Sequence, residues 1–151
     1  MKLLLDELNE EKTIQNVNTL LENYDRLKRI AHSSLDLKSP KFDDMPKAQS
    51  IKNPSEEKIV RRLQAKQEFD AINKSIENLP GEHGRYRYIL KQLYIYRTRP
   101  IEKIYRELHI EKDAYSKLKR EALLAFAESF LIEDLLDWSP KTEIEQKSDR
   151  I

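Results

Sequence analysis

The residues from 79 to 130 constrain the fold most strongly, because their apolar positions keep a helical period through three consecutive segments. Pro100 can open a helix, since it lacks the N–H that would be unsatisfied in a first turn. The apolar residues after it recur at helical spacing: Ile101, Ile104, Tyr105 and Leu108. A four-residue break, 109–112, precedes a second helix whose inward positions are Tyr115, Leu118, Ala122 and Phe126. Two amphipathic helices joined by a short turn, the second of them basic, predict a DNA-reading helix-turn-helix.

The rest of the composition favours an all-α fold. Only two glycines occur, Gly81 and Gly84, both in one turn, and no segment shows the alternation typical of strands. Charged residues make up 36% of the chain, which suits long amphipathic helices around a small core. The absence of cysteine excludes disulfides and thiolate metal sites.

We expect a long N-terminal helix and a Pro-containing linker before the helix-turn-helix. The helix is predicted over 13–33 from an apolar face made of Ile14, Val17, Leu20, Leu21, Tyr24, Leu27 and Ile30. Residues 36–53 contain two prolines and no helical period, so they form a linker or an ordered loop. Asn53 could cap the next helix, which stops at Pro80-Gly81, and a third helix is predicted over 85–96.

The helix that follows the turn is predicted to continue as far as Trp138, where Ser139-Pro140 would end it. The organisation is thus an N-terminal helical arm (1–35), a linker (36–54), a helix-turn-helix domain (55–138) and a disordered tail (139–151).

Positive charge is concentrated where the helix-turn-helix is predicted. Residues 85–120 carry 11 basic and 4 acidic side chains, whereas 121–151 carry 3 basic and 8 acidic ones. A local excess of this kind serves to neutralise phosphates, although a solvated charged face would show the same composition. Its coincidence with the motif favours double-stranded DNA as the partner.

Helical geometry sorts the basic residues by direction. Positions on the side of the second helix away from Tyr115 are candidates for contacts with bases, which Arg, Lys and Ser can make in a major groove: Ser116, Lys117 and Arg120. The flanks of this helix and the preceding turn and helix supply candidates for phosphate contacts: Arg97, Arg99, Lys103, Arg106, Lys112 and Lys119.

Two further groups of residues could contact DNA or serve a structural role. Tyrosines interleaved with basic residues, Tyr94 and Tyr96 among them, could stack on bases. Tyr86, Tyr105 and Tyr115 fall on apolar faces, and Tyr88 is the best-exposed candidate. Lysines at 38, 41, 47 and 52 of the linker could follow a DNA backbone. The favoured alternative is that the apolar residues of the linker pin it onto the helical core.

A second apolar stripe is predicted on the terminal helix, formed by Leu124, Leu131, Leu135 and Trp138. This stripe could pair with a second subunit or with RNA polymerase, or fold back onto the core. The acidic residues around it would keep this end of the protein away from DNA.

Catalysis has little support in the sequence. The three histidines are isolated, no metal-binding spacing occurs, and no glycine-rich loop precedes a helix, so neither a metal nor a nucleotide cofactor is expected. The N-terminal apolar run is too short for a signal peptide or a membrane span, which predicts a cytoplasmic protein without membrane contact.

Longer sequence elements carry a resemblance to known families. Residues 72–122 look like region 4 of sigma factors. The segment SPKFDDMPK at 39–47, followed by EKIVRR at 57–62 and YSKLKREAL at 115–123, resembles the ArpU family of phage transcriptional regulators, which includes the RinA-like late-gene activators. The similarity covers about 35–130.

This resemblance implies an activator of late, packaging or lysis genes, encoded by a phage or prophage of a Gram-positive host. The family commonly has a capping Ser where this chain has Glu111, so Asp113 could cap the recognition helix instead and shorten it by two residues. Two alternatives stay open: a sigma-like subunit of RNA polymerase, and a small terminase-type DNA packaging protein. Binding to DNA without polymerase would separate the activator from the first of these, and a closed ring of subunits would favour the second.

Overall fold

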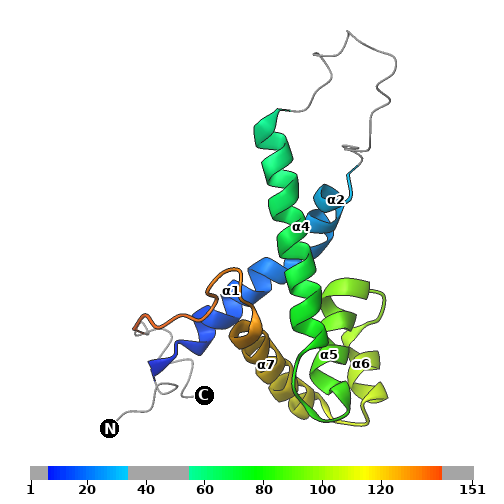
Figure 1. Ribbon diagram of the computed structural model, residues 1–151. Coiled ribbons are helices and arrows are strands. Elements are labelled where there is room, and N and C mark those ends of the chain that lie inside the picture. Colours follow the sequence, from blue (N-terminus) through cyan, green and yellow to red (C-terminus); the bar gives the residue numbers. More distant parts are fainter. Residues whose placement is uncertain (1–6, 34–54, 141–151) are drawn as a thin grey trace.

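The computed structural model describes residues 7–33 and 55–140, and every regular element in these two ranges is helical (Figure 1). The α-helices are α1 (Glu10–Glu22), α2 (Tyr24–Ala31), α4 (Glu56–Glu77), α5 (Arg85–Leu90), α6 (Ile101–Glu107) and α7 (Lys112–Ser129). A 3₁₀ turn at Glu82–Gly84 and a π-helical segment at Lys91–Tyr96 complete them. The predicted all-α class is confirmed for these residues. The predicted linker (36–54) and the part of the predicted tail beyond residue 140 lie outside the described residues.

The predicted N-terminal helix is interrupted. Instead of one helix over 13–33, α1 ends at Glu22 and α2 begins at Tyr24, with Asn23 between them in a non-helical conformation. The Asn23 side chain donates to the Thr19 carbonyl at 2.8 Å, and its backbone N–H bonds back to Leu20 at 3.1 Å. Asparagine competes in this way with the regular helical hydrogen bonds, which explains a break that the apolar period alone does not show.

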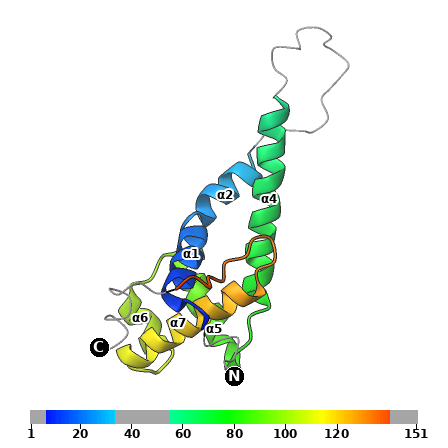
Figure 2. The ribbon, with the colours of Figure 1, turned by 90° about the vertical axis from the view of Figure 1, so that its left-hand side faces the viewer.

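Helices α2 and α4 form an antiparallel hairpin that projects from the rest of the helical body (Figures 1 and 2). Helix α4 begins after Ser55, whose side chain accepts the Lys58 N–H at 3.2 Å, so the cap is Ser55 and not the predicted Asn53. Towards the lower end of α4, Phe69, Ile72 and Ile76 are buried, as the periodicity predicts. Near the start of α4 the apolar side chains are less covered, and Leu63 is 55% exposed.

The lower end of α4 turns through Pro80-Gly81 into α5, which runs between the two apolar clusters of the core. The larger cluster joins α1, α2 and α4 to α7, and its fully buried members include Leu21, Ile72 and Phe126. The smaller cluster comprises Ile89, Ile104 and Tyr115 and fixes α6 against α5 and α7. Residues 85–96 are helical as predicted, but the second half is π-helical and ends at Arg97, where φ is 53°.

Helices α6 and α7 are joined by a turn without glycine. His109 takes the left-handed conformation (φ 59°) that usually selects glycine, while its N–H bonds to the Arg106 carbonyl at 3.0 Å. The next N–H, of Ile110, reaches the Tyr105 carbonyl at 3.2 Å. These two hydrogen bonds form a Schellman motif, which ends α6 and directs the chain into α7.

Helix α7 ends nine residues earlier than predicted (Ser129 rather than Trp138). Its last turn is satisfied by the Ser129 hydroxyl, which bonds to the Ala125 and Phe126 carbonyls at 3.2 Å each, and Phe130 is extended. The chain then continues through a non-helical segment, 130–140, here named the C-terminal strap. No glycine or proline precedes Pro140 in this segment, so the sequence carries no strong signal for the earlier end.

The C-terminal strap crosses α1 in the opposite direction. The Asn16 side chain donates to the Leu135 carbonyl at 3.1 Å, and the Asp137 N–H donates to the Thr13 hydroxyl at 2.9 Å. At its far end the Asn9 N–H donates to the Asp137 carbonyl at 2.8 Å. Helix α1 is therefore held between α7 and the strap, as part of the same core as the later helices.

Candidate nucleic-acid interface

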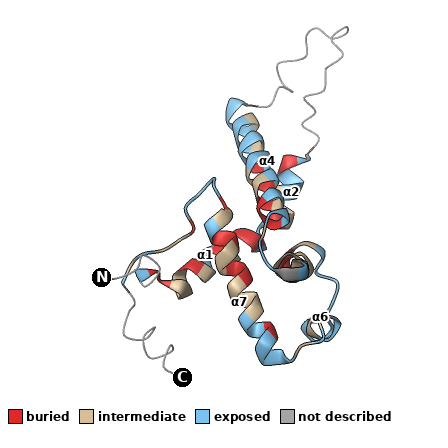
Figure 3. Cartoon of the chain, turned by 60° about the horizontal axis from the view of Figure 1, so that its bottom comes forward, coloured by how far each residue is buried: buried red, intermediate tan, exposed pale blue. Residues whose placement is uncertain are grey.

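The candidate interface is the first half of α7 together with α6. Tyr115 and Ala122 of α7 are buried, as predicted for inward positions, and Leu118 is half-buried. On α6, Ile104 is buried, but Ile101 is 50% exposed and does not join the predicted apolar stripe. Figure 3 shows the start of α7 and much of α6 as exposed surface at one end of the molecule. Two packed helices thus present an open face that belongs largely to the second one.

Two of the predicted base-contacting residues lie on this open face. Ser116 and Lys117 are both exposed, one turn into α7, and Lys112 is exposed at its first residue. The exposed Asp113 lies in the same first turn, where a carboxylate interacts favourably with the positive end of the helix. A hydroxyl and two ammonium groups on one helical surface can donate hydrogen bonds to base edges and phosphates.

Arg120, the third predicted base-contacting residue, is engaged elsewhere. Its guanidinium donates to Glu10 at 2.8 Å and to Glu11 at 2.9 Å, both in the first turn of α1. Burial works to lower the pKa of Arg120, but the hydrogen bonds and charges of the two glutamates outweigh it and leave the pKa raised. The sequence does not reveal this pairing, because 109 residues separate Arg120 from Glu11.

The predicted phosphate-contacting residues divide into two groups. Arg97 bonds to the Tyr94 carbonyl at 3.1 Å and the Glu22 carbonyl at 3.3 Å, so it closes the end of α1. Arg99 pairs with Glu107 and lies 3.5 Å from the Tyr88 hydroxyl. The others stand on α6 and α7: Lys103, Arg106 and Lys112 are exposed and Lys119 is half-buried. Arg106 also lies 4.0 Å from Glu102, a distance at which two exposed charges interact weakly.

The ring of Tyr88 is not free to stack on a base. This side chain is half-buried, and its hydroxyl donates to Glu107. Burial and the hydrogen bond to Glu107 raise its pKa. Tyr115 is buried, with its ring 5.8 Å from that of Tyr105, whereas Tyr86 and Tyr105 are half-buried. The linker lysines, at 38, 41, 47 and 52, lie outside the described residues.

Helix α7 begins without a side-chain cap. Glu111 occupies the capping position but makes no capping hydrogen bond, and α7 starts at Lys112. Asp113 therefore does not shorten the helix, and the prediction that it could do so is wrong.

The predicted partner face on the terminal helix does not form, because α7 ends first. Leu135 is buried in the larger cluster and only 2% exposed, whereas Leu131 is 91% exposed. Leu124 is half-buried on α7, and Trp138 is 38% exposed on the C-terminal strap. These four residues thus occupy different surroundings and share no helical stripe.

Within residues 7–33 and 55–140, no group of three or more His, Asp or Glu side chains is arranged to hold a metal ion. In the same part of the chain, no helix combines the length and the apolar character needed to cross a membrane.

Comparison with known proteins identifies two relatives, both carrying the name autolysin regulatory protein ArpU. The protein of Streptococcus phage O1205 is 34% identical over 131 residues, which cover 85% of this chain and 94% of that protein. The protein of Enterococcus hirae is 32% identical over 133 residues, covering 84% and 92%. No protein-family model matches the chain, and no solved structure matches it significantly.

Proposed function

Because the chain belongs to the ArpU family of phage regulatory proteins, we propose that it regulates transcription by binding double-stranded DNA through α6 and α7. The gene that encodes it lies in a phage or prophage, and its targets are late, packaging or lysis genes, which it activates. Regulation of an autolysin, the role in the name of both relatives, favours lysis genes among these targets. The protein works in the cytoplasm of the bacterial host, without a cofactor and without catalysis.

The observation that carries this proposal is the exposed surface formed by Ser116 and Lys117 beside Lys112. A helix of 18 residues is long enough to enter a major groove with its first turns while its later turns stay packed in the core. Here the first turns are exposed and the later ones contain Leu123 and Phe126, which are buried. This division between one end and the other is what a groove-reading helix requires.

We assign roles on this surface by exposure. Ser116 and Lys117 contact base edges, while Lys112, Lys119, Lys103 and Arg106 contact phosphates. Arg120 positions α7 against α1 and does not read bases, because two carboxylates already satisfy its guanidinium. Activation then requires host RNA polymerase as a second partner, in contact with the protein on the DNA.

The test uses labelled fragments of the phage or prophage genome that encodes the protein, incubated with the full chain at two salt concentrations. One fragment should bind tightly, and its affinity should fall steeply with salt. Lys117→Ala should weaken binding to it by about 5- to 150-fold, the effect of about 1–3 kcal/mol typical of a base contact.

Lys74→Ala is the matched control, since Lys74 is an exposed lysine on a different helix, α4. It should bind as the parent protein does. Binding that appears only after host RNA polymerase is added would replace this mechanism with that of a sigma-like subunit. A closed ring of subunits in solution would favour the packaging protein instead.

A further inference from the structure

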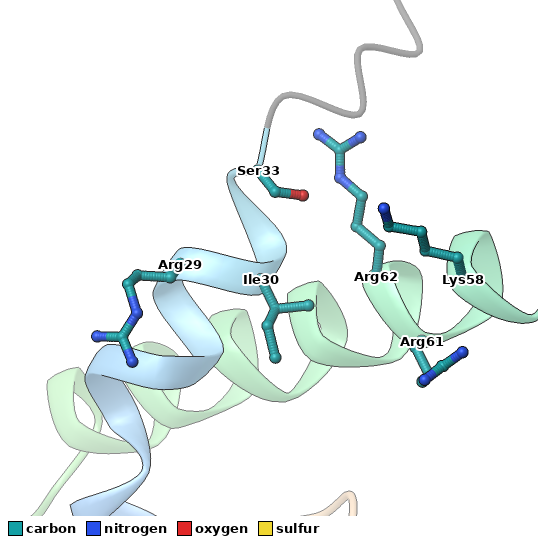
Figure 4. A pocket seen from close by; sticks show the side chains of 6 residues that line it. All are labelled: Arg29, Ile30, Ser33, Lys58, Arg61 and Arg62. Atoms are coloured by element: carbon teal, nitrogen blue, oxygen red, sulfur yellow. The ribbon is translucent and has the colours of Figure 1, made fainter. Parts of the chain in front are cut away.

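The tip of the α2–α4 hairpin carries a hollow lined by cationic side chains. Its volume is about 400 Å³, and the residues that line it are Arg29, Ile30, Ser33, Lys58, Arg61 and Arg62. Figure 4 shows Lys58 and Arg62 rising from α4 on the side of Ser33, with Ile30 reaching from α2 toward α4. Four of the six side chains are cationic and none is acidic. The walls of the hollow are largely apolar, and the cationic ends of Lys58 and Arg62 lie together on the side of Ser33, whereas Arg61 and Arg29 point away from them (Figure 4). The rim of the hollow therefore attracts an anion.

Arg62 is held in place on the α4 side of this hollow, where its side chain extends outward beside Ser33 (Figure 4). Its Nε donates to the Ala31 carbonyl at 3.4 Å, which satisfies the last turn of α2. Its Nη1 is buried and has no hydrogen-bond partner among the described residues. A buried guanidinium N–H without a partner leaves a strong donor available, and its desolvation is costly unless an acceptor binds there.

The charges around the tip add to this preference. The described residues 24–33 and 55–62 contain six basic side chains (Arg26, Lys28, Arg29, Lys58, Arg61 and Arg62) and three acidic ones (Asp25, Glu56 and Glu57), a net charge of +3. Asp25 lies near the other end of the hairpin, 3.8 Å from Arg97. Glu56 and Glu57 stand in the first turn of α4, on the side of Arg61 and Val60. The net charge of residues 24–33 and 55–62 is thus positive despite the two glutamates.

The residues that line the hollow favour the phosphates of a nucleic-acid backbone over other anionic ligands. Arginine forks match phosphate oxygens, and the hollow is open along the groove between two helices. None of the residues that line it is aromatic, so a nucleotide base would have nothing to stack on. Phosphates of a DNA backbone need only cations and donors, which the hollow supplies.

We propose that the tip of the α2–α4 hairpin binds the backbone of the DNA outside the site contacted by α7. The inference rests on the proposed function and adds a second contact to it. Arg61 and Glu77 are 16 residues apart in α4, which corresponds to about 24 Å of helix, and α6 and α7 lie beyond that lower end. One turn of DNA is about 34 Å, so the second contact falls about one turn away from the groove that α7 enters.

The experiment compares two double variants of equal charge change. Arg29→Ala with Lys58→Ala removes one exposed cation from each wall of the hollow, whereas Lys66→Ala with Lys74→Ala removes two exposed lysines from other positions of α4. Binding is measured as a function of salt on two duplexes. One extends two helical turns beyond the α7 site on each side, and the other ends a few base pairs beyond that site.

On the long duplex, the hollow variant should reduce the slope of log K against log salt by about 1 to 2, since each phosphate contact contributes about 0.9. The control variant should keep the parent slope. On the short duplex, both variants should behave like the parent protein. Circular dichroism and urea denaturation check that each variant is folded. If the double variant is not folded, the single variants Arg29→Gln and Lys58→Gln replace it, and each should show part of the change in slope.

An unchanged slope in the hollow variant on the long duplex, with Lys117→Ala still impaired, would overturn this inference and leave the proposed function intact. An equal loss on both duplexes would overturn the placement outside the α7 site. If neither Lys117→Ala nor the hollow variant altered binding, the proposed function itself would fail. Loss of binding to a partner protein in the hollow variant, with DNA binding intact, would assign the tip to that protein instead.

Discussion

The Arg120 guanidinium of α7 donates a hydrogen bond to the Glu10 carboxylate of α1 at 2.8 Å. A second bond, to Glu11 at 2.9 Å, makes this a three-residue cluster that joins the end of the basic segment to the first described helix. The Arg120 side chain is 40% exposed, so solvent screens these pairs and each contributes modestly. Their geometry nevertheless fixes where α1 lies on α7.

Replacing Arg120 should therefore affect folding more than DNA recognition. We expect Arg120→Ala to lower the free energy of unfolding by about 1 kcal/mol, because two partly exposed ion pairs are lost. DNA affinity should fall by less than it does in Lys117→Ala. Urea denaturation and DNA titration of the same preparations measure both effects.

The double variant Glu10→Gln, Glu11→Gln provides the matching control. It should cost about as much stability as Arg120→Ala, and adding Arg120→Ala to it should cost little more, because the pairs are already gone. Unchanged stability in Arg120→Ala, together with abolished DNA binding, would return Arg120 to the set of base-contacting residues.

Two leucines of the C-terminal strap should differ sharply in their effect on stability. Leu135 is 2% exposed in the larger cluster, and Leu131 is 91% exposed. Leu135→Ala should lower the free energy of unfolding by about 2–5 kcal/mol through the cavity it leaves. Leu131→Ala should stay within about 0.5 kcal/mol of the parent. Thermal and urea denaturation measure both variants. Equal losses of stability in Leu131→Ala and Leu135→Ala would indicate that residues 130–138 continue α7 instead.

Glycine at position 109 should stabilise the turn between α6 and α7. His109 adopts φ 59°, a left-handed conformation that costs an L-residue about 1–2 kcal/mol and glycine much less. Because His109 is exposed, His109→Gly sacrifices little packing. We expect a gain of about 0.5–1 kcal/mol in unfolding free energy, after the larger chain entropy of glycine is deducted. A loss of stability, with the helical circular dichroism unchanged, would contradict the left-handed assignment.

The C-terminal strap should weaken in acid because of Asp137. The Ser139 hydroxyl and its N–H, at 2.8 Å, both donate to the Asp137 carboxylate and hold its pKa below the usual 3.8. A carboxyl whose pKa is lower in the folded state stabilises the fold above its unfolded pKa, and this contribution is lost as the pH falls through the folded pKa. Asp137→Asn should thus be less stable than the parent at pH 6, and the difference should shrink below about pH 3.8. Urea midpoints at a series of pH values measure it, and a difference that grows in acid would contradict the assignment.

Sequence periodicity predicted the elements that are buried on one face. The burial of Ile72, Ile104, Ala122 and Phe126 follows from helical spacing alone, and so do the approximate limits of α4 and α6. It could not predict breaks made by side chains that bond to their own backbone. Asn23 ends α1 and Ser129 ends α7 in this way, and neither is followed by a glycine or proline.

Only part of the candidate interface was predicted, because some of its residues depend on contacts with distant parts of the chain. Ser116 and Lys117 are exposed where helical geometry places them, because their direction depends only on α7 itself. Arg97 and Arg120 lie in the same basic segment, but contacts with distant residues determine their roles. The hollow at the hairpin tip combines Arg29 of α2 and Lys58 of α4. In the sequence, each of these residues has a few basic neighbours, which is too common a pattern to predict a shared site.

The hydrogen bond between Thr13 and Asp137 has a consequence for how the protein is made. These residues are 124 positions apart, so at 5–20 residues per second a ribosome needs roughly 6–25 s to reach the second after the first. During that time α1 lacks the strap residues that bond to Thr13 and Asn16, and Leu135 is missing from the larger cluster. The fold of α1 is therefore completed only near the end of synthesis, and a polypeptide interrupted before Leu135 would expose the apolar surface that chaperones and proteases recognise.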